Sequence, residues 1–316
     1  MVHLPRGTRI DNFIVGQLLG EGSFGAVYEV TSKDGSEKHA LKVESTKSMP
    51  QVLRMEVQLL NTLDQLGFLR HFCRIHGKGR ETRQQVSFNY VIMTLVGKSI
   101  QDLRMMSPAQ HFNINTAVGV GIQSLEALQD LHSIGYLHRD VKPSNIATGR
   151  AEIGELQKIY MLDFGMARKY VKEDHPPFTI RHARERAEFR GTVRYAAISC
   201  HIGREQSRKD DCESWLYTLI ELTNGRLPWC EEDMAQAGNW KQTARSNPIL
   251  RAQLFEGCPA EYSEIMNHID SLRYYDMPDY DKIFNLLRRS LASRKLAEHP
   301  YDWVDRRWPN VKIKRS

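Results

Sequence analysis

The sequence predicts an α+β fold in which a small β-rich lobe with one key helix precedes a larger, mainly helical lobe. Residues 13–43 are rich in strand-forming residues and contain an Asp-Gly pair, which is typical of a hairpin turn. Beyond Gly97, apolar residues recur at helical spacing, as Leu125, Leu128 and Leu131 do. The length of 316 residues suits two packed lobes, because single hydrophobic cores stop growing at about 250–300 residues.

Within the small lobe, local patterns predict each element. The expected strands cover about 13–19, 26–30, 40–43 and 88–93. One helix is expected over about 48–63, with Ser48 as its cap and Pro50 in its first turn. We assign residues 1–316 to a single domain, with the small lobe at about 11–93, a connector at 94–97, the helical lobe at 98–305 and a basic tail at 306–316.

Composition restricts the function classes. With 41% hydrophobic and 26% charged residues, the chain can fill a core and is not a disordered polyelectrolyte. Its net charge of +6 hints at an acidic partner without naming one. No apolar run approaches the about 20 residues of a membrane-spanning helix, and no signal peptide begins the sequence. Five scattered cysteines without a secretory signal favour a reducing compartment. We therefore expect a cytoplasmic or nuclear monomer that binds neither membrane nor nucleic acid.

A glycine-rich segment in the small lobe fits the pattern G-x-G-x-x-G-x-V. It consists of Gly20, Glu21, Gly22, Ser23, Phe24, Gly25, Ala26 and Val27. Glycines let a backbone approach phosphate groups closely. A dinucleotide-binding fold would need a helix after the third glycine, whereas strand-forming residues follow here. A strand–loop–strand that covers a nucleotide fits better, with an ordinary glycine hairpin as the alternative for the segment in isolation.

Lys42 and Glu56 form a second candidate pair. Lys42 lies in an otherwise apolar strand, where a lone lysine usually points into water. The following helix, however, places Glu56 in the middle of an apolar stripe. A buried carboxylate without a cation is costly, so Glu56 needs a partner. Lys42 is the natural one, and the pair could then hold nucleotide phosphates. Glu44 is nearer to Lys42 in sequence, but strand neighbours two residues apart do not easily form such a tether.

The strongest signal is a pair of motifs in the helical lobe. The sequence H-R-D-V-K-P-S-N covers residues 138–145, and D-F-G follows at 163–165. Phosphoryl transfer needs an aligned hydroxyl nucleophile and metal ions that neutralise the phosphates. Asp140 can orient and deprotonate the hydroxyl, while Asn145 and Asp163 offer hard oxygen ligands for Mg²⁺. Both motifs in order, downstream of the glycine loop, make coincidence a poor explanation.

In this order, the glycine loop, the strand lysine, the helix glutamate, H-R-D-x-x-x-x-N and D-F-G make the chain resemble the eukaryotic protein kinases. Within them it is similar to the casein kinase I superfamily, through GTVRYAA at 191–197 and EQSRKDDCES at 205–214, where most kinases carry A-P-E. The tau-tubulin kinase branch is the most similar one, on the segments 41–45, 52–57, 142–145, 160–165 and 189–195. The resemblance spans about residues 11–305.

The resemblance implies a bilobal protein kinase fold and transfer of the ATP γ-phosphate, with Mg²⁺, to Ser or Thr of protein substrates. Lys142, two residues after Asp140, implies Ser/Thr specificity and would contact the transferring phosphate. Asp211 would anchor the catalytic loop from the following helix. Ala147 stands where many kinases have a larger residue, which predicts a roomier nucleotide pocket.

The implied site residues fall into three sets. The catalytic residues would be Asp140, Lys142, Lys42 and Glu56. The metal ligands would be Asn145 and Asp163. The nucleotide site would comprise Gly20, Glu21, Gly22, Ser23, Phe24, Gly25, Val27, Ala40, Lys42, Met93, Thr94, Val96 and Ala147.

The segment 163–194 carries eight basic and five acidic residues. Clustered arginines suit recognition of phosphate or carboxylate groups, and casein kinase I relatives use basic groups here to recognise acidic or already phosphorylated substrates. Arg190 and Arg194 are therefore our candidate substrate-binding residues. An acidic stretch at 230–233 stands where relatives are often basic, and it opposes a second anion site.

Two other functions stay open on the sequence alone. A catalytically silent, kinase-like scaffold would bind partners without chemistry, although the intact set Lys42, Glu56, Asp140, Asn145 and Asp163 argues against it. A basic nucleic-acid binder would account for the charge, but the chain carries no RNA- or DNA-binding motif. Much of the basic excess is also local, since five basic residues lie in the last eleven.

Overall fold

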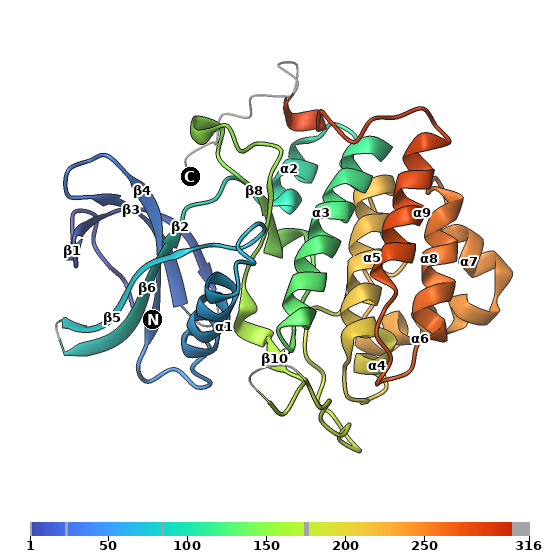
Figure 1. The fold of residues 1–316 in the computed structure, drawn as a ribbon, viewed down its shortest axis with the longest axis horizontal. Coiled ribbons are helices and arrows are strands. Elements are labelled where there is room, and N and C mark those ends of the chain that lie inside the picture. The colour runs from blue at the N-terminus through green and yellow to red at the C-terminus, as the bar shows by residue number, and fades with distance from the viewer. Residues whose placement is uncertain (1, 23–24, 84, 174–176, 305–316) are drawn as a thin grey trace. The chain divides into compact units, whose positions relative to one another are not determined.

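The computed structural model describes residues 2–22, 25–83, 85–173 and 177–304. Ser23 and Phe24 of the glycine loop, and the predicted basic tail, lie outside the described residues. The chain separates into two compact units, the first containing Met1–Gly97 and Leu162–Gly165 and the second Lys98–Met161 and Met166–Ser316. The predicted α+β architecture is confirmed, because the first unit is a sheet with one long helix and the second is mainly helical (Figure 1).

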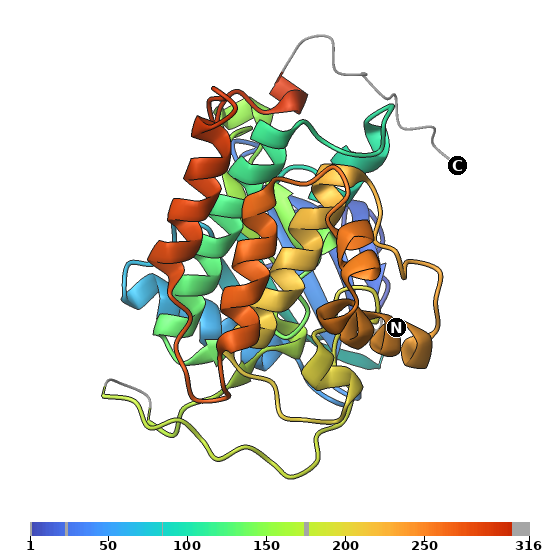
Figure 2. The ribbon, with the colours of Figure 1, turned by 90° about the vertical axis from the view of Figure 1, so that its right-hand side faces the viewer.

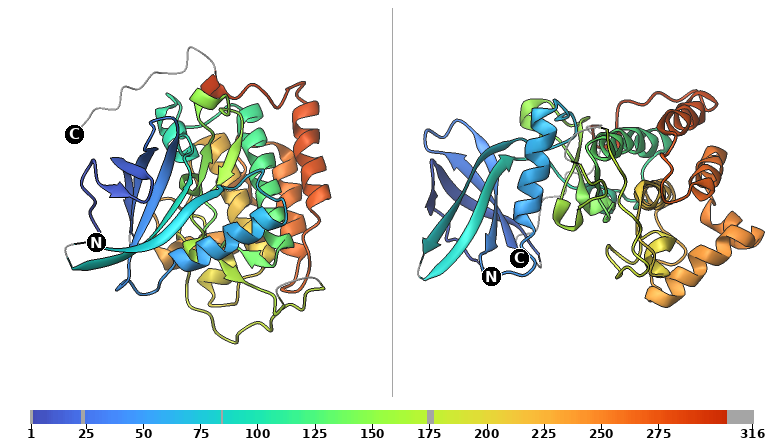
Figure 3. Two further views of the ribbon diagram at one scale, coloured as in Figure 1. Left: turned by 60° about the vertical axis from the view of Figure 1, so that its left-hand side comes forward. Right: turned by 60° about the horizontal axis from the view of Figure 1, so that its bottom comes forward.

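The first unit is built on a six-stranded antiparallel sheet with strand order β1-β2-β3-β4-β6-β5. Its strands are β1 (Arg9–Ile10), β2 (Phe13–Gly22), β3 (Gly25–Ser32), β4 (Lys38–Ser45), β5 (Ile75–Arg83) and β6 (Val86–Thr94). The helix α1 (Leu53–Gln65) packs against β5 and β6 (Figure 3). The predicted Asp-Gly turn joins β3 to β4, with Gly35 in the left-handed region at φ 75°.

The core of this sheet explains where the first unit begins. Buried apolar residues of several strands form one cluster, among them Ile10, Val15, Leu41 and Phe88. Val2 and Leu4 belong to the same cluster, so the unit includes residues before position 11, where the sequence placed its start. Burying each such aliphatic side chain contributes about 1.5–3 kcal/mol, which ties the N-terminal residues to the sheet.

The predicted start of the first helix is wrong. The helix begins at Leu53, so Ser48 is not its cap and Pro50 precedes it. The first helical N–H groups are met instead by Glu44 at the end of β4, whose Oε1 accepts from Val52 N at 2.8 Å and Leu53 N at 3.3 Å. A buried carboxylate from another element thus replaces the local cap that helix starts usually have.

The second unit is built around α3 (Ile114–Ser133), which confirms the helical spacing of its leucines. This helix packs against α5 (Arg208–Asn224) and α9 (Tyr280–Ala292), and α8 (Ala260–Ser271) packs against both of the latter. These four helices lie side by side in Figure 2. The remaining helices are α2 (Ile100–Met106), α4 (Ile198–His201), α6 (Met234–Ser246) and α7 (Pro248–Leu254).

Short strands and turns frame the two predicted motifs. The strand β7 (Tyr136–Leu137) pairs with β10 (Arg168–Lys169), and β8 (Ile146–Thr148) pairs with β9 (Ile159–Met161). Among the described residues, 3₁₀ turns are present as η1 (Pro143–Asn145), η2 (Ala151–Ile153), η3 (Phe164–Met166) and η4 (Asp302–Val304). The H-R-D motif and the residues up to Asn145 therefore connect β7 to β8, and the D-F-G motif follows β9. Within the described ranges, no helix has both the length and the apolar character needed to cross a membrane.

Candidate active site

In the first unit, the structure brings together three predicted side chains from separate parts of the chain. Lys42 lies in β4, Glu56 in α1, and Asp163 directly after Leu162. Lys42 Nζ is 2.6 Å from Glu56 Oε2 and 3.4 Å from Asp163 Oδ1. Glu56 is buried on the apolar face of α1, so the expected pairing of a buried carboxylate with Lys42 is present.

The two carboxylates keep Lys42 charged. Burial alone would lower the pKa of Lys42, but the charges of Glu56 and Asp163 outweigh burial and raise this pKa above its ordinary value. The side chain of Glu56 is 4% exposed, whereas that of Asp163 is 49% exposed. The cluster therefore has one acidic end inside the fold and one open to solvent, an arrangement that can meet phosphate groups and a metal ion.

The D-F-G segment is held within the first unit by its own neighbours. Asp163 has a φ of 60°, in the left-handed region that costs energy for a residue other than glycine. Phe164 is buried with its ring centroid 5.8 Å from that of Phe72, and Gly165 N donates to Asp163 Oδ1 at 3.4 Å. These contacts fix the backbone that presents the Asp163 carboxylate.

The glycine loop joins β2 to β3. Gly20 pairs with Val27, and Gly22 with Gly25, in the antiparallel register. A Cβ built on Gly25 would lie 1.9 Å from the carbonyl oxygen of Val43, so close packing of β3 on β4 requires this glycine. For Gly20 and Gly22, by contrast, no described atom lies within 4 Å of such a Cβ. The first two glycines thus leave space that a ligand could use, while the third serves the sheet.

In the second unit, polar side chains converge on Asp140. Thr192 Oγ1 donates to Asp140 Oδ1 at 2.7 Å, and Lys142 Nζ is 2.7 Å from Asp140 Oδ2. Lys142 Nζ also donates to Thr192 Oγ1 at 2.8 Å, which closes a three-residue cluster. Asn145 Nδ2 donates to the backbone oxygen of Asp140 at 2.9 Å. That contact turns the amide oxygen of Asn145 away from Asp140, where it can serve as a hard ligand.

A buried carboxylate holds the catalytic loop. Asp211, in α5, accepts from the backbone nitrogens of His138 at 2.7 Å and Arg139 at 2.8 Å, and pairs with His132 Nε2 at 2.9 Å. Arg139 has a left-handed φ of 67°, and its Nε donates to the carbonyl of Met166 at 2.7 Å. The structure therefore contains the anchoring contacts expected of Asp211.

The His132–Asp211 pair is neutral on one side and anionic on the other. Burial lowers the pKa of His132, which keeps its ring neutral. Because Nε2 donates to Asp211, Nδ1 is the acceptor for the hydroxyl of Tyr280. Burial would raise the pKa of Asp211, but the hydrogen bonds that it accepts, first the one from the His132 ring and then the one from the His138 backbone, outweigh burial and lower it. Asp211 thus remains ionised and retains all its hydrogen bonds at neutral pH.

The remaining residues predicted for nucleotide binding are divided between the units. Ala40 and Met93 are register partners in β4 and β6, and each is 8% exposed. Also in the first unit, Glu21 lies in β2, Thr94 ends β6 and Val96 lies in the connector, while Ala147 is buried in β8 of the second unit.

The two candidate substrate-binding arginines differ in their partners and exposure. Arg194 NH1 is 3.2 Å from Oε1 of the buried Glu221, and its NH2 donates to the carbonyl of Cys230 at 3.1 Å. Arg190 instead pairs with the exposed Glu188 at 2.6 Å and is itself half exposed. An exposed ion pair contributes only about 0–1 kcal/mol, so Arg190 can exchange partners. The guanidinium of Arg194 is held by contacts within the fold, which gives less support to a role in binding substrate.

Two residues near this site were missed from the sequence. Thr192 lies inside the GTVRYAA segment that carries the family resemblance, but no sequence pattern assigns it a role. Lys241 lies on the same buried face of α6 as Ala237 and Ala244. A lysine three and four residues from buried alanines was the available signal.

The described residues contain no group of three or more His, Cys, Asp or Glu side chains that could hold a metal ion. Mg²⁺ needs fewer protein ligands, because it keeps water and substrate phosphate oxygens in its shell. Asn145 and Asp163 offer amide and carboxylate oxygens of the kind that it prefers.

Two kinds of match link the chain to known proteins. A family model described as "Protein kinase domain" matches residues 13–283. A protein of Dictyostelium discoideum named "Probable serine/threonine-protein kinase" is 36% identical over 287 residues, which is 90% of this chain and 55% of that protein. A serine/threonine-protein kinase of Caenorhabditis elegans is 36% identical over 289 residues, with 89% and 73% covered. The casein kinase I homolog 1 of Saccharomyces cerevisiae is 29% identical over 303 residues, with 93% and 53% covered. The chain thus spans about half the length of the first and last of these relatives.

Proposed function

The chain belongs to the protein kinase family, and from this premise we propose that it is a serine/threonine protein kinase that transfers the γ-phosphate of ATP to protein substrates. The observation that carries the proposal is the cluster of Asp140, Lys142 and Thr192, in which a carboxylate is held by a cation and a hydroxyl. A scaffold without chemistry would not need this arrangement.

In the second unit, Asp140 accepts the proton of the substrate hydroxyl at a carboxylate oxygen and orients that hydroxyl for attack. Thr192 donates to Oδ1 and Lys142 contacts Oδ2, so both oxygens have fixed directions. The ammonium of Lys142 also places positive charge where the transferred group carries negative charge.

In the first unit, Lys42 would bind phosphate oxygens while Glu56 holds its ammonium from the interior. Asp163 of the first unit offers a carboxylate oxygen for Mg²⁺, and Asn145 of the second unit offers an amide oxygen. When bound, ATP supplies the phosphoryl group and Mg²⁺ neutralises charge on its phosphates. These roles follow the donor types present and require no further protein ligand.

We also propose membership of the casein kinase I superfamily, nearest to the tau-tubulin kinase branch, with a preference for acidic or already phosphorylated sites. The yeast casein kinase I homolog supports the first part. Arg190 supports the second, since its exposed guanidinium can leave Glu188 for a substrate phosphate. We also propose a cytoplasmic or nuclear location, which rests on the scattered cysteines of the sequence.

The test is incubation with Mg·ATP and either casein or a tau-like protein, followed by identification of the phosphorylated amino acid. We expect phosphoserine and phosphothreonine. Matched peptides with neutral, acidic or phosphorylated residues beside the acceptor then test the preference, which Arg190→Ala should weaken. A protein that binds ATP but phosphorylates none of these substrates would instead support the silent scaffold.

A further inference from the structure

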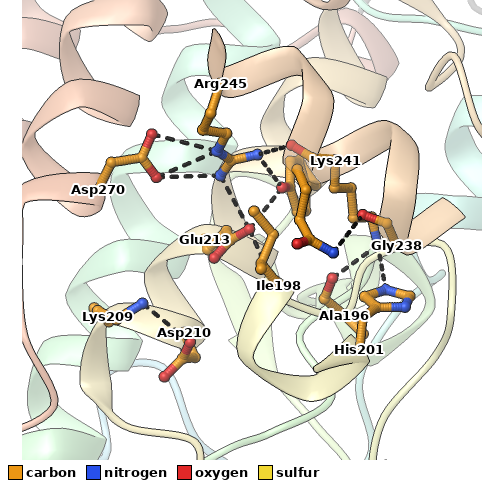
Figure 4. A network of polar contacts seen from close by, with 12 residues as sticks. Ala196, Ile198, His201, Lys209, Asp210, Glu213, Gly238, Lys241, Arg245 and Asp270 are labelled. Carbon is orange, nitrogen blue, oxygen red and sulfur yellow. Dashed lines mark hydrogen bonds and ion pairs between the residues drawn. The ribbon is translucent and has the colours of Figure 1, made fainter. Parts of the chain in front are cut away.

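A buried lysine in the second unit has no part in the mechanism above. Lys241, in α6, has no exposed surface. An ammonium has three N–H donors, and three acceptors surround this one, with Val193 O and Ala196 O at 2.7 Å and His201 Nε2 at 3.1 Å. Figure 4 shows Lys241 reaching from α6 to Ala196 and His201. Burial of a charge is costly unless it is hydrogen-bonded, so these bonds offset the cost of burying Lys241.

The surroundings of Lys241 are arranged to receive a cation. Its Nζ lies 5.2 Å from the ring centroids of both Tyr217 and Trp229, within range of a cation–π interaction. His201 Nδ1 lies 3.0 Å from the carbonyl of Met234 and therefore donates to it, which leaves Nε2 as the acceptor for Lys241. A Cβ on Gly238 would lie 2.9 Å from the His201 ring, so this glycine permits the close approach of α4 and α6.

The carbonyls that Lys241 binds belong to the loop 192–197, which other groups also hold. Trp229 Nε1 donates to the carbonyl of Arg194 at 2.7 Å, and the hydroxyl of Tyr195 donates to the buried Glu221. The four consecutive residues 193–196 are therefore held, through backbone carbonyls or a side chain, by α5, α6 and Trp229.

The opposite end of the same loop meets the catalytic loop. A Cβ on Gly191, whose φ is 116°, would lie 2.7 Å from the carbonyl oxygen of Arg139, so the two loops are in close backbone contact. The next residue, Thr192, donates to Asp140. A shift of the loop at the Lys241 end is thus transmitted over a few residues to the hydrogen bond that orients Asp140.

We propose that Lys241 is a positioning residue for phosphoryl transfer, which holds the loop 192–197 so that the Thr192 hydroxyl stays on the Asp140 carboxylate. This inference rests on the proposed kinase function. A lysine that merely filled the core would be replaceable by a methionine of similar length, because packing alone needs no N–H donors.

The protonation state of Lys241 allows an independent test of its role in holding the loop. Burial lowers the pKa of Lys241 to about 7. Above that pH the neutral amine has two N–H donors for three acceptors, so the loop loses a hydrogen bond. The groups that face Lys241 are His201 and Cys200 on α4, Glu213 and Tyr217 on α5, Trp229 beside the loop, and Arg245 on α6 itself.

The experiment compares Lys241→Met with the matched control Lys209→Met, whose ammonium pairs with Asp210 on its own helix. Steady-state transfer to a Ser/Thr peptide, ATP affinity, and hydrogen exchange of amides 192–198 are measured for each. We expect Lys241→Met to lower kcat about 10- to 100-fold, as small misplacements of catalytic groups do. ATP affinity should be unchanged, and exchange in the loop should accelerate. The control should match the wild type in kcat and loop exchange.

Wild-type kcat in Lys241→Met would overturn the inference, whether or not loop exchange changed. Should that variant fail to fold, hydrogen exchange of the loop in the wild type tests the inference. Its loop protection, corrected for intrinsic exchange, should fall as pH rises through about 7, and a loop that is unprotected at lower pH, where Lys241 is charged, would overturn the inference. A wild type that transfers no phosphate would contradict the proposed function. Hydrogen exchange of amides 192–198 would still report whether Lys241 holds the loop.

Discussion

Replacement of Asp211 by asparagine separates the anchoring of the catalytic loop from its chemistry. The substitution keeps the shape of the side chain but removes its charge and leaves one acceptor oxygen. In the wild type, the two carboxylate oxygens serve the backbone nitrogens of His138 and Arg139 and the ring of His132. One of these donors must therefore lose its partner in Asp211→Asn.

The magnitude follows from these three bonds. An unpaired buried N–H costs about 1–3 kcal/mol, and each remaining bond loses about 1 kcal/mol when its acceptor becomes neutral. The free energy of unfolding should fall by about 3–5 kcal/mol, a large part of the about 5–15 kcal/mol of a typical domain. Release of the left-handed backbone at Arg139 should also turn Asp140 and lower kcat about 100-fold.

Denaturant unfolding and steady-state phosphate transfer measure the two effects. The matched control is Asp302→Asn, since Asp302 accepts from Asn113 and Thr116 at a distance in sequence from the catalytic loop. The control should lower stability without lowering kcat. An Asp211→Asn protein with the stability and kcat of the wild type would refute the anchoring role.

Four further outcomes are expected. Lys42→Met should lower the free energy of unfolding by about 3–5 kcal/mol, because it leaves the buried Glu56 unpaired, and adding Glu56→Gln should recover part of that loss. A double variant that is less stable than Lys42→Met in denaturant titrations would contradict this. Gly191→Ala should suppress phosphate transfer without changing ATP affinity in calorimetry, because its Cβ would lie 2.7 Å from the catalytic-loop backbone; normal transfer would count against this contact. Burial lowers the pKa of His201 from 6.5 to about 4, so the unfolded chain binds more protons between these values and stability should fall as pH decreases through them, whereas His201→Gln should show a flatter profile. Ala147→Leu should weaken binding of ATP and of bulky inhibitors in calorimetry, and equal affinities would remove the idea of a roomier pocket.

Features that local sequence patterns mark, such as a carboxylate in an apolar helix face, could be predicted from the sequence. Glu56 stood in an apolar helix stripe, where an unpaired carboxylate is unfavourable, and Lys42 is the partner that the structure contains. Strands β2 to β4 and helix α3 followed from their periodicity. Asp140 and Asn145 were found through a motif whose spacing brings both residues to one short loop.

Contacts between distant segments could not be predicted in this way. Glu44 caps α1 from a neighbouring strand, and Arg194 meets Glu221, a residue that no local pattern singles out. The acceptors of Lys241 are backbone carbonyls, which every residue carries, so the sequence does not mark them. Strand β5 also escaped prediction, since its sequence is polar and contains two glycines, and it is strand because β6 pairs with it.

We propose that Asp140 acts in phosphate transfer from ATP to Ser or Thr, and this role decides whether the chain is an active kinase. It is tested most directly by the rate at which the wild type and Asp140→Asn transfer radiolabelled phosphate to one peptide, at matched ATP occupancy and with unfolding curves recorded for both. We predict a wild-type rate that the substitution lowers about 100- to 10,000-fold while ATP affinity stays the same. Equal rates in the two proteins, or no transfer by a wild type that binds ATP, would contradict it.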